Sequence, residues 1–188
     1  MLTIITDTST LATSLTSLKA HLGITSSSED TRLTALIYSA QKAIEGMVDG
    51  GLILTPTVFE DVLPSFPSHK IYIQQPPLHT LTSIKYYDGA NVQQTLATDQ
   101  YYTVKRTYGP AFVQPVVNWP SAYSRPDSIA IRYTAGFASV PPDLSHCVLM
   151  LAAHYNENRE AELAGGATSE IKLGVDRVLR AYQWGSYV

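Results

Sequence analysis

The sequence predicts an α+β fold in which helices from the N- and C-terminal parts form a small bundle, with an antiparallel β region inserted between them. Apolar residues at helical spacing occupy both ends of the chain. From about residue 52 to residue 137 the composition changes to Thr, Val, Tyr and Ile broken by Pro, Gly and Asn, which is typical of strands and turns. Prolines recur through this middle region and favour short antiparallel strands over a central parallel sheet. We expect one domain over residues 1–188.

Two helices are predicted within about residues 14–49. The first has Ser14 as its N-cap and Gly23 at the left-handed C-terminal position. The second has a start at Ser27 and Asp30 that resembles a capping box, and it stops at the glycines 50–51. Their apolar stripes contain Leu11, Leu15, Leu18 and Leu22 in the first helix, and Leu33, Leu36, Ile37, Ala40, Ile44, Met47 and Val48 in the second.

The middle region, about 52–137, predicts a series of short strands. A turn over residues 88–91, Asp-Gly-Ala-Asn, suits a hairpin because Gly and Asn tolerate positive φ. The candidate strands are 57–63, 70–73, 81–88, 92–96, 101–106, 111–117 and 128–134.

Helices return over about residues 142–184. One begins at the prolines 141–142, because proline is tolerated in a first helical turn, and its centre is apolar nearly all round. Residues 161–172 contain a Gly-Gly pair and read as a flexible linker. A last short helix presents Val175, Val178, Leu179 and Tyr182 on one face.

Composition narrows the classes of function. The net charge is −3 and charged residues are 15% of the chain, so there is no excess of cations to neutralise a phosphate backbone. Cys147 is the only cysteine and is expected to be a small buried apolar residue. No stretch approaches the length of a membrane span, so we expect no membrane association. We expect the chain to be cytoplasmic when it is made.

Motifs for catalysis are not apparent. The phosphate-binding glycine loops and the G-x-S-x-G nucleophile elbow are absent from the sequence. Asp143, Ser145 and His146 are too close on one helical turn to form a relay by themselves. His154 and Glu157 share a helix face, but a di-iron site needs a second such unit and two more inward glutamates. We expect no catalytic residue, no metal site and no cofactor.

Two alternatives stay open at this stage. A hydrolase could use His154 or a pair of the carboxylates scattered through the β region, namely Glu60, Asp61, Asp88, Asp99 and Asp127. A DNA-binding module could use the tyrosines of that region, among them the doublets 86–87 and 101–102. The first predicts a deep polar pocket with convergent acids, and the second a salt-sensitive affinity for DNA.

The order of short motifs along nearly the whole chain resembles the phage head-tail connector family, the head-completion adaptors of long-tailed phages and gene transfer agents. The family's first helices are matched by Ser14-Leu15-x-x-x-Lys19-Ala20-His21-Leu22 and by 29–46, and its β unit by Pro76-Pro77-Leu78 and 81–88. The other matching motifs are Trp119-Pro120, Arg125-Pro126-Asp127, Tyr133-Thr134-Ala135-Gly136, Val140-Pro141, His154-Tyr155-x-Glu157-Asn158-Arg159-Glu160 and Leu173-Gly174-Val175. The extension over residues 1–13 departs from the family pattern.

This resemblance implies a structural virion protein at the head-tail interface. It implies a homo-oligomeric ring, a dodecamer in the virion, that lies beneath the portal protein and extends the DNA channel. The ring presents its far side to a stopper or tail-completion protein, and DNA passes through its lumen without specific binding. For the contact with the portal or a neighbouring subunit we expect the apolar C-terminal face, Val175, Leu179, Tyr182 and Trp184; packing of these four residues on their own bundle is the alternative.

Overall fold

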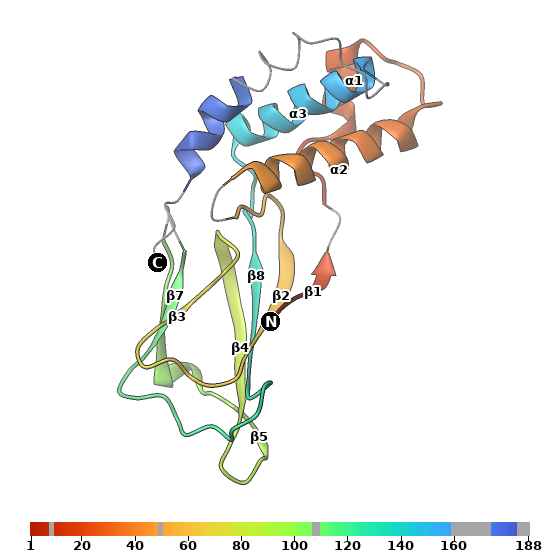
Figure 1. Cartoon of the computed structure of the whole chain (residues 1–188). Coiled ribbons are helices and arrows are strands. Elements are labelled where there is room, and N and C mark those ends of the chain that lie inside the picture. The colour runs from red at the N-terminus through yellow and green to blue at the C-terminus, as the bar shows by residue number, and fades with distance from the viewer. Residues whose placement is uncertain (8–9, 49–50, 107–109, 159–173, 184–188) are drawn as a thin grey trace. The chain divides into compact units, whose positions relative to one another are not determined.

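The computed structural model describes residues 1–7, 10–48, 51–106, 110–158 and 174–183. The chain divides into two compact units, which are coloured along the sequence in Figure 1. The β unit comprises Met1–Thr8 and Pro56–Ala138, and the helical unit comprises Ser9–Thr55 and Ser139–Val188. The prediction that they make up a single domain stays a prediction.

Two antiparallel sheets build the β unit. Sheet A has five strands in the order β1 (Leu2–Asp7), β2 (Thr57–Leu63), β8 (Ile129–Ala135), β4 (Leu78–Tyr87) and β5 (Gln93–Thr95). Sheet B has three strands in the order β3 (Ile71–Tyr72), β7 (Phe112–Pro115) and β6 (Tyr101–Val104), and the short 3-10 helix η1 (Thr98–Gln100) leads into β6.

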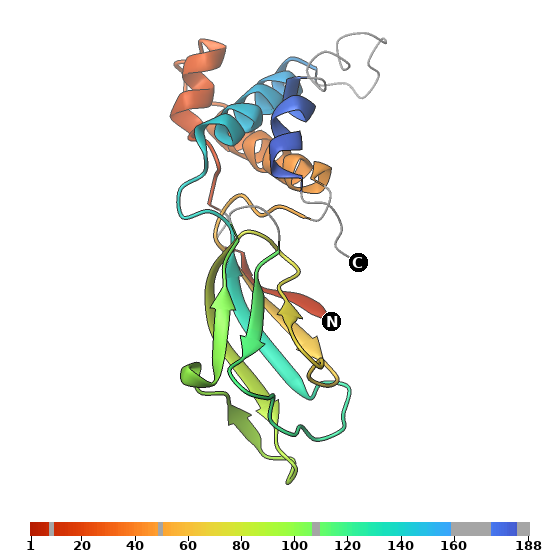
Figure 2. The same cartoon turned by 90° about the vertical axis from the view of Figure 1, so that its left-hand side faces the viewer.

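The core of the β unit lies on the face of sheet A that sheet B covers (Figures 1 and 2). Every second residue of β8 is buried, because successive side chains of a strand point to opposite faces. Tyr133 of β8 stacks on Phe59 of β2 with ring centroids 5.8 Å apart. Ile84 of β4 and Val113 of β7 are fully buried as well. The packing of alternating apolar side chains is therefore what holds this unit together.

The helical unit contains α1 (Leu15–Leu22), α2 (Asp30–Met47) and α3 (Pro142–Glu157), followed by helical residues 174–179 and the 3-10 turn η2 (Arg180–Tyr182). Helices α2 and α3 pack side by side, and both views show the last helix against them (Figures 1 and 2). The stripe that the sequence predicts on α2 is buried at Leu33, Ile37, Ala40 and Ile44. Leu144, Cys147, Val148 and Leu151 of α3 are buried too. These residues form the core of the bundle.

Buried polar side chains of α2 hold the segments that enter and leave the helical unit. Gln41, fully buried, accepts a hydrogen bond from the amide of Ala12 at 2.9 Å and donates one to the hydroxyl of Thr55 at 2.9 Å. Glu45 accepts the amide of Leu54 at 2.9 Å and pairs with Lys42 at 2.9 Å. Because these groups are buried, the loss of any one of these hydrogen bonds would leave a polar group without a partner and without water. The protein would then lose the full desolvation free energy of that group.

The α+β class is confirmed, and so are the predicted caps of α1. Ser14 accepts the amide of Ser17, and Gly23 has a φ of +68°. The seven predicted strands are all present, β2 with the predicted ends 57–63 and the other six with different ends, and Asn91 takes positive φ in the 88–91 turn. The start of α2 was predicted wrongly: the N-cap is Glu29, which makes no side-chain capping bond, and Ser27 contributes only its carbonyl, to the amide of Asp30.

The main element that the sequence did not predict is β1, which lies in the segment 1–13 that departs from the family pattern. It pairs antiparallel with β2 and shifts register between Ile4 and Thr6. The expected linker 161–172 and the stop at Gly50 lie outside the described residues.

Candidate interaction surfaces

His154, the strongest metal or acid-base candidate of the sequence, is buried at the end of α3. Its Nδ1 lies 3.0 Å from the side-chain amide of Asn158, and the same amide donates to the His154 carbonyl. Its predicted partner Glu157 is exposed. In the part of the chain that the structure describes, no group of His, Cys, Asp or Glu residues is arranged to hold a metal ion. His154 therefore acts as a polar contact that closes the helix end.

Asp143, Ser145 and His146 lie in the first turns of α3, and Asp143 has a structural task. Its carboxylate accepts the Tyr182 hydroxyl at 2.9 and 3.0 Å, and its Oδ1 also accepts the amide of Leu144. Cys147, one turn further on, is buried, and that burial, together with the charge of Asp143, raises the pKa of its thiol. A thiol whose pKa is raised is a poor nucleophile.

The carboxylates of the β region are held separately. Glu60 pairs with Arg132 across β2 and β8 at 2.7 Å, and Asp127 pairs with Arg125 at 2.6 Å. Asp88 accepts bonds from the Gln94 side chain and from the amides of Val92 and Ala90, and these bonds lower its pKa. These acids serve strand pairing and turn formation.

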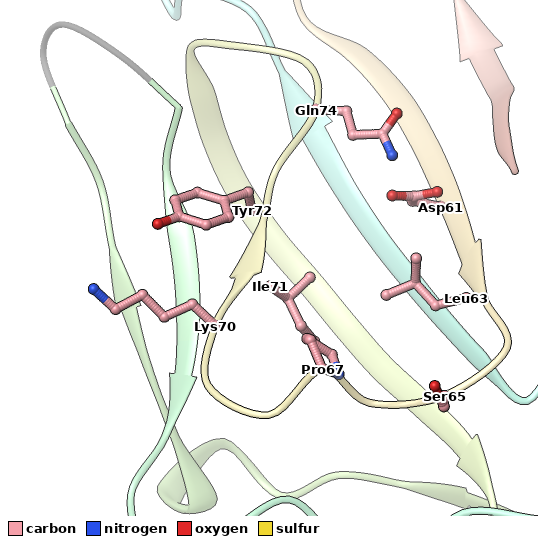
Figure 3. A pocket seen from close by; sticks show the side chains of 8 residues that line it. All are labelled: Asp61, Leu63, Ser65, Pro67, Lys70, Ile71, Tyr72 and Gln74. Carbon is pink, nitrogen blue, oxygen red and sulfur yellow. The ribbon is translucent and has the colours of Figure 1, made fainter. Parts of the chain in front are cut away.

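Asp61 is the buried carboxylate of this group, and it lines a pocket of about 270 Å³ between β2 and the segment that leads into β3 (Figure 3). Burial, with the Asp61 charge added to it, raises the pKa of the Tyr133 hydroxyl well above its usual value. Lys70 also lines the pocket, but its side chain extends away from Asp61 (Figure 3). The described lining of this pocket and of two further hollows, at Asp99 and at Asp176, contains one carboxylate each and no histidine, which is not the arrangement of convergent acids that the hydrolase alternative predicts.

The residues of the predicted C-terminal contact have different surroundings in the structure. Val175 and Leu179 are buried within the chain, which fits the alternative that they pack on their own bundle. Tyr182 is half-buried and donates to Asp143, and Trp184 lies outside the described residues. Their assignment as a contact with a partner stays a prediction.

An exposed apolar edge is present at β1. This strand is at one end of sheet A, and among the described elements no strand pairs with its outer side. Ile4 and Ile5 are 57% and 43% exposed, so two adjacent apolar side chains of this edge strand face solvent. An exposed hydrophobic edge strand is a ready template for pairing with another chain. The sequence contained the signal only as two adjacent isoleucines.

A second exposed surface is the outer face of sheet B, which we define by Lys70, Tyr72, Tyr102, Val104 and Arg106 around the ring of Phe112. Tyr72 and Val104 are the register partners of Phe112 on β3 and β6. Tyr72 and Tyr102 are 52% and 60% exposed. The ammonium of Lys70 is 4.4 Å and the guanidinium of Arg106 is 5.3 Å from the centroid of the Phe112 ring. This face combines aromatic rings with cations.

Comparison with known families identifies the chain. The model of the family described as "Head completion protein" matches residues 11–175, which is most of the sequence. The chain belongs to the head completion protein family. This match confirms the resemblance that the sequence motifs suggested. It also confirms that the protein is a structural component of the virion. Comparison with curated proteins finds no match.

Solved structures similar to this head completion protein come from gene transfer agent particles. One is from the neck of an empty particle computed with C6 symmetry: the TM-score is 0.81 at 24% identity, and the match covers 100% of this chain and 97% of the other. Another, from the virion of a native particle, has a TM-score of 0.79 at 24% identity with the same coverage. A third, from the neck of a native particle computed with C12 symmetry, has a TM-score of 0.78 at 23% identity, again with the same coverage. The whole fold is therefore shared with these chains.

Proposed function

We propose that this head completion protein is a head-tail connector of a bacteriophage or related particle. It forms a ring beneath the portal, extends the DNA channel and offers the docking surface for the stopper or tail. The observation that carries the proposal is the family match over residues 11–175. Similarity over the whole chain to proteins from particle necks supports a place at the head-tail interface of the virion.

A ring of twelve copies is the assembly that we propose. Similar chains come from necks computed with C12 and with C6 symmetry. A ring of twelve satisfies both symmetries, whereas a ring of six satisfies only the second. In the ring, the outer edge of β1 pairs with a neighbouring copy, which covers Ile4 and Ile5. A head-to-tail contact of this kind, repeated by rotation, closes into a ring.

The portal and the stopper or tail-completion protein are the other proposed partners. Val175, Leu179, Tyr182 and Trp184 remain the proposed contact with the portal or a neighbouring subunit. Because Val175 and Leu179 are buried in the free chain, such a contact requires the last helix to exchange its present packing for the partner. Truncation after Gly166 tests this: a shortened protein that still attaches to portal-bearing, DNA-filled heads would show that the segment is not the anchor.

We propose no catalytic activity, no cofactor and no membrane contact. The matched family is a structural one, and the buried thiol and the separately paired carboxylates of the β region serve the fold. No helix in the described part of the chain combines the length and apolar content that spanning a bilayer requires. DNA passes through the ring without sequence-specific recognition.

Electron microscopy of the purified protein, alone and mixed with its portal, tests the connector function. We expect twelve-fold rings stacked coaxially on the portal. Ile4→Lys should reduce ring formation, because a charge on an edge strand opposes pairing. Lys85→Gln, another single substitution on an exposed strand position, should leave it unchanged. Failure of the native chain to associate with the portal in any form would overturn the proposal.

A further inference from the structure

The outer face of sheet B carries two cations, Lys70 and Arg106, for which the described residues provide no carboxylate partner. Elsewhere in the described chain, Lys19, Arg32, Lys42, Arg125 and Arg132 each pair with a carboxylate. In the same described ranges neither Lys70 nor Arg106 has a carboxylate partner, although both lie over one ring, that of Phe112. Lys105, beside them, donates to the carbonyl of His79.

Two like charges gathered over one ring repel each other, and the ring offsets this only in part. A cation over an aromatic face gains about 0.5–1 kcal/mol at an exposed site. An anion placed between Lys70 and Arg106 would relieve the remaining repulsion. The face is thus arranged to receive negative charge, on a chain whose net charge is −3.

The strand order that produces this face also supplies neutral hydrogen-bond donors. Because side chains alternate along a strand, Ile71 and Val113 point into the core while Tyr72 and Phe112 lie on the outer face. Lys70 and Tyr72 extend to the same side of β3 (Figure 3). Tyr102, two residues before Val104 on β6, brings a second exposed phenol to that side. Phenol hydroxyls and cations together are the groups that contact phosphate oxygens in protein–DNA interfaces.

We propose that the outer face of sheet B is a sequence-independent contact for the phosphate backbone of double-stranded DNA. This inference rests on the proposed function, in which DNA passes through the ring, and it names the surface that meets the DNA. Lys70 and Arg106, with Lys105 at the margin, bind the phosphates, and Tyr72 and Tyr102 donate to their oxygens. Two or three cations in each subunit bind the duplex weakly, so the DNA stays in contact with the ring and can still move through it.

Counterion release sets the expected size of the effect. Neutralising two to three phosphates gives a slope of roughly −1.8 to −2.7 for log affinity against log salt concentration. Affinity should therefore fall roughly 10- to 40-fold between 50 and 200 mM NaCl. No dependence on base sequence is expected, because these groups read the backbone and not the base edges.

Nuclear magnetic resonance of the 15N-labelled full chain, titrated with a 12-base-pair duplex at both salt concentrations, detects weak binding and locates it. We expect amide shifts that concentrate in residues 70–73, 101–106 and 111–114 and diminish with salt. Absence of shifts at 50 mM NaCl, or shifts that concentrate elsewhere, would overturn the inference. A polyglutamate peptide of equal charge that binds the same residues as tightly as DNA would also overturn it, in favour of an acidic protein partner.

Matched variants distinguish binding by this face from a general effect of the net charge on DNA affinity. Lys70→Gln/Arg106→Gln should weaken binding at least about tenfold at 50 mM NaCl. Lys85→Gln/Arg177→Gln changes the net charge equally, at two exposed cations that are not among the residues of this face, and should stay within about twofold of the native chain. Equal loss in both variants would contradict the inference.

A further variant guards against a folding artefact, because Lys70 and Arg106 also cover Phe112. Tyr102→Ala removes an exposed side chain and should weaken binding roughly threefold with a native spectrum. No change in affinity in Tyr102→Ala would remove the tyrosine from the site. A chain that forms rings on its portal yet shows no DNA shifts overturns this inference alone, whereas a chain that fails to associate with the portal overturns the proposed function.

Discussion

Apolar surface is divided unequally between the two units. Of the large apolar side chains that are exposed in the described residues, Met47 belongs to the helical unit, and all the others belong to the β unit: Met1, Ile4, Ile5, Tyr72, Val92, Tyr102, Val104, Val116, Val117 and Tyr123. Charge does not follow the same division, because Lys19, Arg32 and Lys42 of the helical unit and Arg125 and Arg132 of the β unit all pair with carboxylates. Within the β unit, sheet B instead holds Lys70 and Arg106 over an aromatic ring.

This difference indicates that the two units have different roles. In the helical unit the apolar stripes are buried, and the buried polar side chains Gln41 and Glu45 form hydrogen bonds within the unit. The β unit has a buried core too, but its edge strand and its sheet B face expose groups that gain by contact with something else. In the proposed connector, the ring contact at β1 and the DNA contact at sheet B therefore both lie on the β unit, while the proposed C-terminal contact lies on the helical unit. The following substitutions test this division.

The largest expected contrast is between two isoleucines. Ile44→Ala, in the fully buried stripe of α2, should lower the free energy of unfolding by about 2–5 kcal/mol, because it leaves a cavity. Ile4→Ala, on the exposed edge of β1, should change it by less than about 0.5 kcal/mol. Urea denaturation followed by circular dichroism measures both. Equal losses of unfolding free energy in the two variants would contradict the difference in burial between α2 and β1.

Thiol reactivity gives a second contrast. Cys147 is buried and its pKa is raised, so at pH 8 it holds less thiolate than an exposed thiol, and a reagent reaches it only when the bundle opens. We expect alkylation at least about 100-fold slower than in urea, which corresponds to about 2.7 kcal/mol. In a Cys147→Ala background, Tyr102→Cys should react at the rate of an unfolded peptide. Fast labelling of native Cys147 would show that the helical unit is open.

A third contrast concerns polar groups. Gln41→Leu keeps the volume of the side chain but leaves the Ala12 amide and the Thr55 hydroxyl without their buried partner. We expect a loss of about 1–3 kcal/mol in the free energy of unfolding. The matched change Gln93→Leu, on the exposed strand β5, should stay within about 0.5 kcal/mol. Thermal denaturation distinguishes the two variants. An unchanged free energy of unfolding in Gln41→Leu would show that these buried hydrogen bonds do not stabilise the helical unit.

The smallest expected effect is at the start of α1. Ser14→Ala removes the side-chain acceptor for the Ser17 amide and should cost about 1 kcal/mol. Ser14→Asp restores an acceptor and should recover most of that loss, measured by thermal denaturation of both variants. A native-like Ser14→Ala would mean that α1 is held by the burial of Leu18 alone.

Local signals explain what the sequence predicted well. The caps Ser14 and Gly23 act within one turn of α1, and the alternation along β8 needs only the strand itself. Strand β1 was missed because Ile4 and Ile5 are adjacent and both exposed, which gives no alternation, and because its partner β2 begins some fifty residues later. Similarly, periodicity predicted a helical face at Val175 and Leu179 but not whether that face packs on its own chain.

The sheet B face could not be predicted for the same reason. Lys70 and Arg106 are far apart in the sequence, and only the order β3, β7, β6 brings both over Phe112. The sequence showed tyrosine doublets and a near absence of basic pairs, which argued against DNA binding. Arg125 and Arg132 of the same unit pair with carboxylates, whereas Lys70 and Arg106 lie together over one ring, and only the structure reveals this difference.

Hydrogen–deuterium exchange of the free chain and of the assembled ring, read peptide by peptide, tests the division of labour most directly. Our account predicts that amides of β1 gain protection on ring formation, because the outer edge of that strand finds a partner, while the buried turns of α2 and α3 exchange at the same slow rate in both states. Gained protection confined to α2 and α3, with β1 unchanged, would contradict the claim that the β unit carries the ring contact.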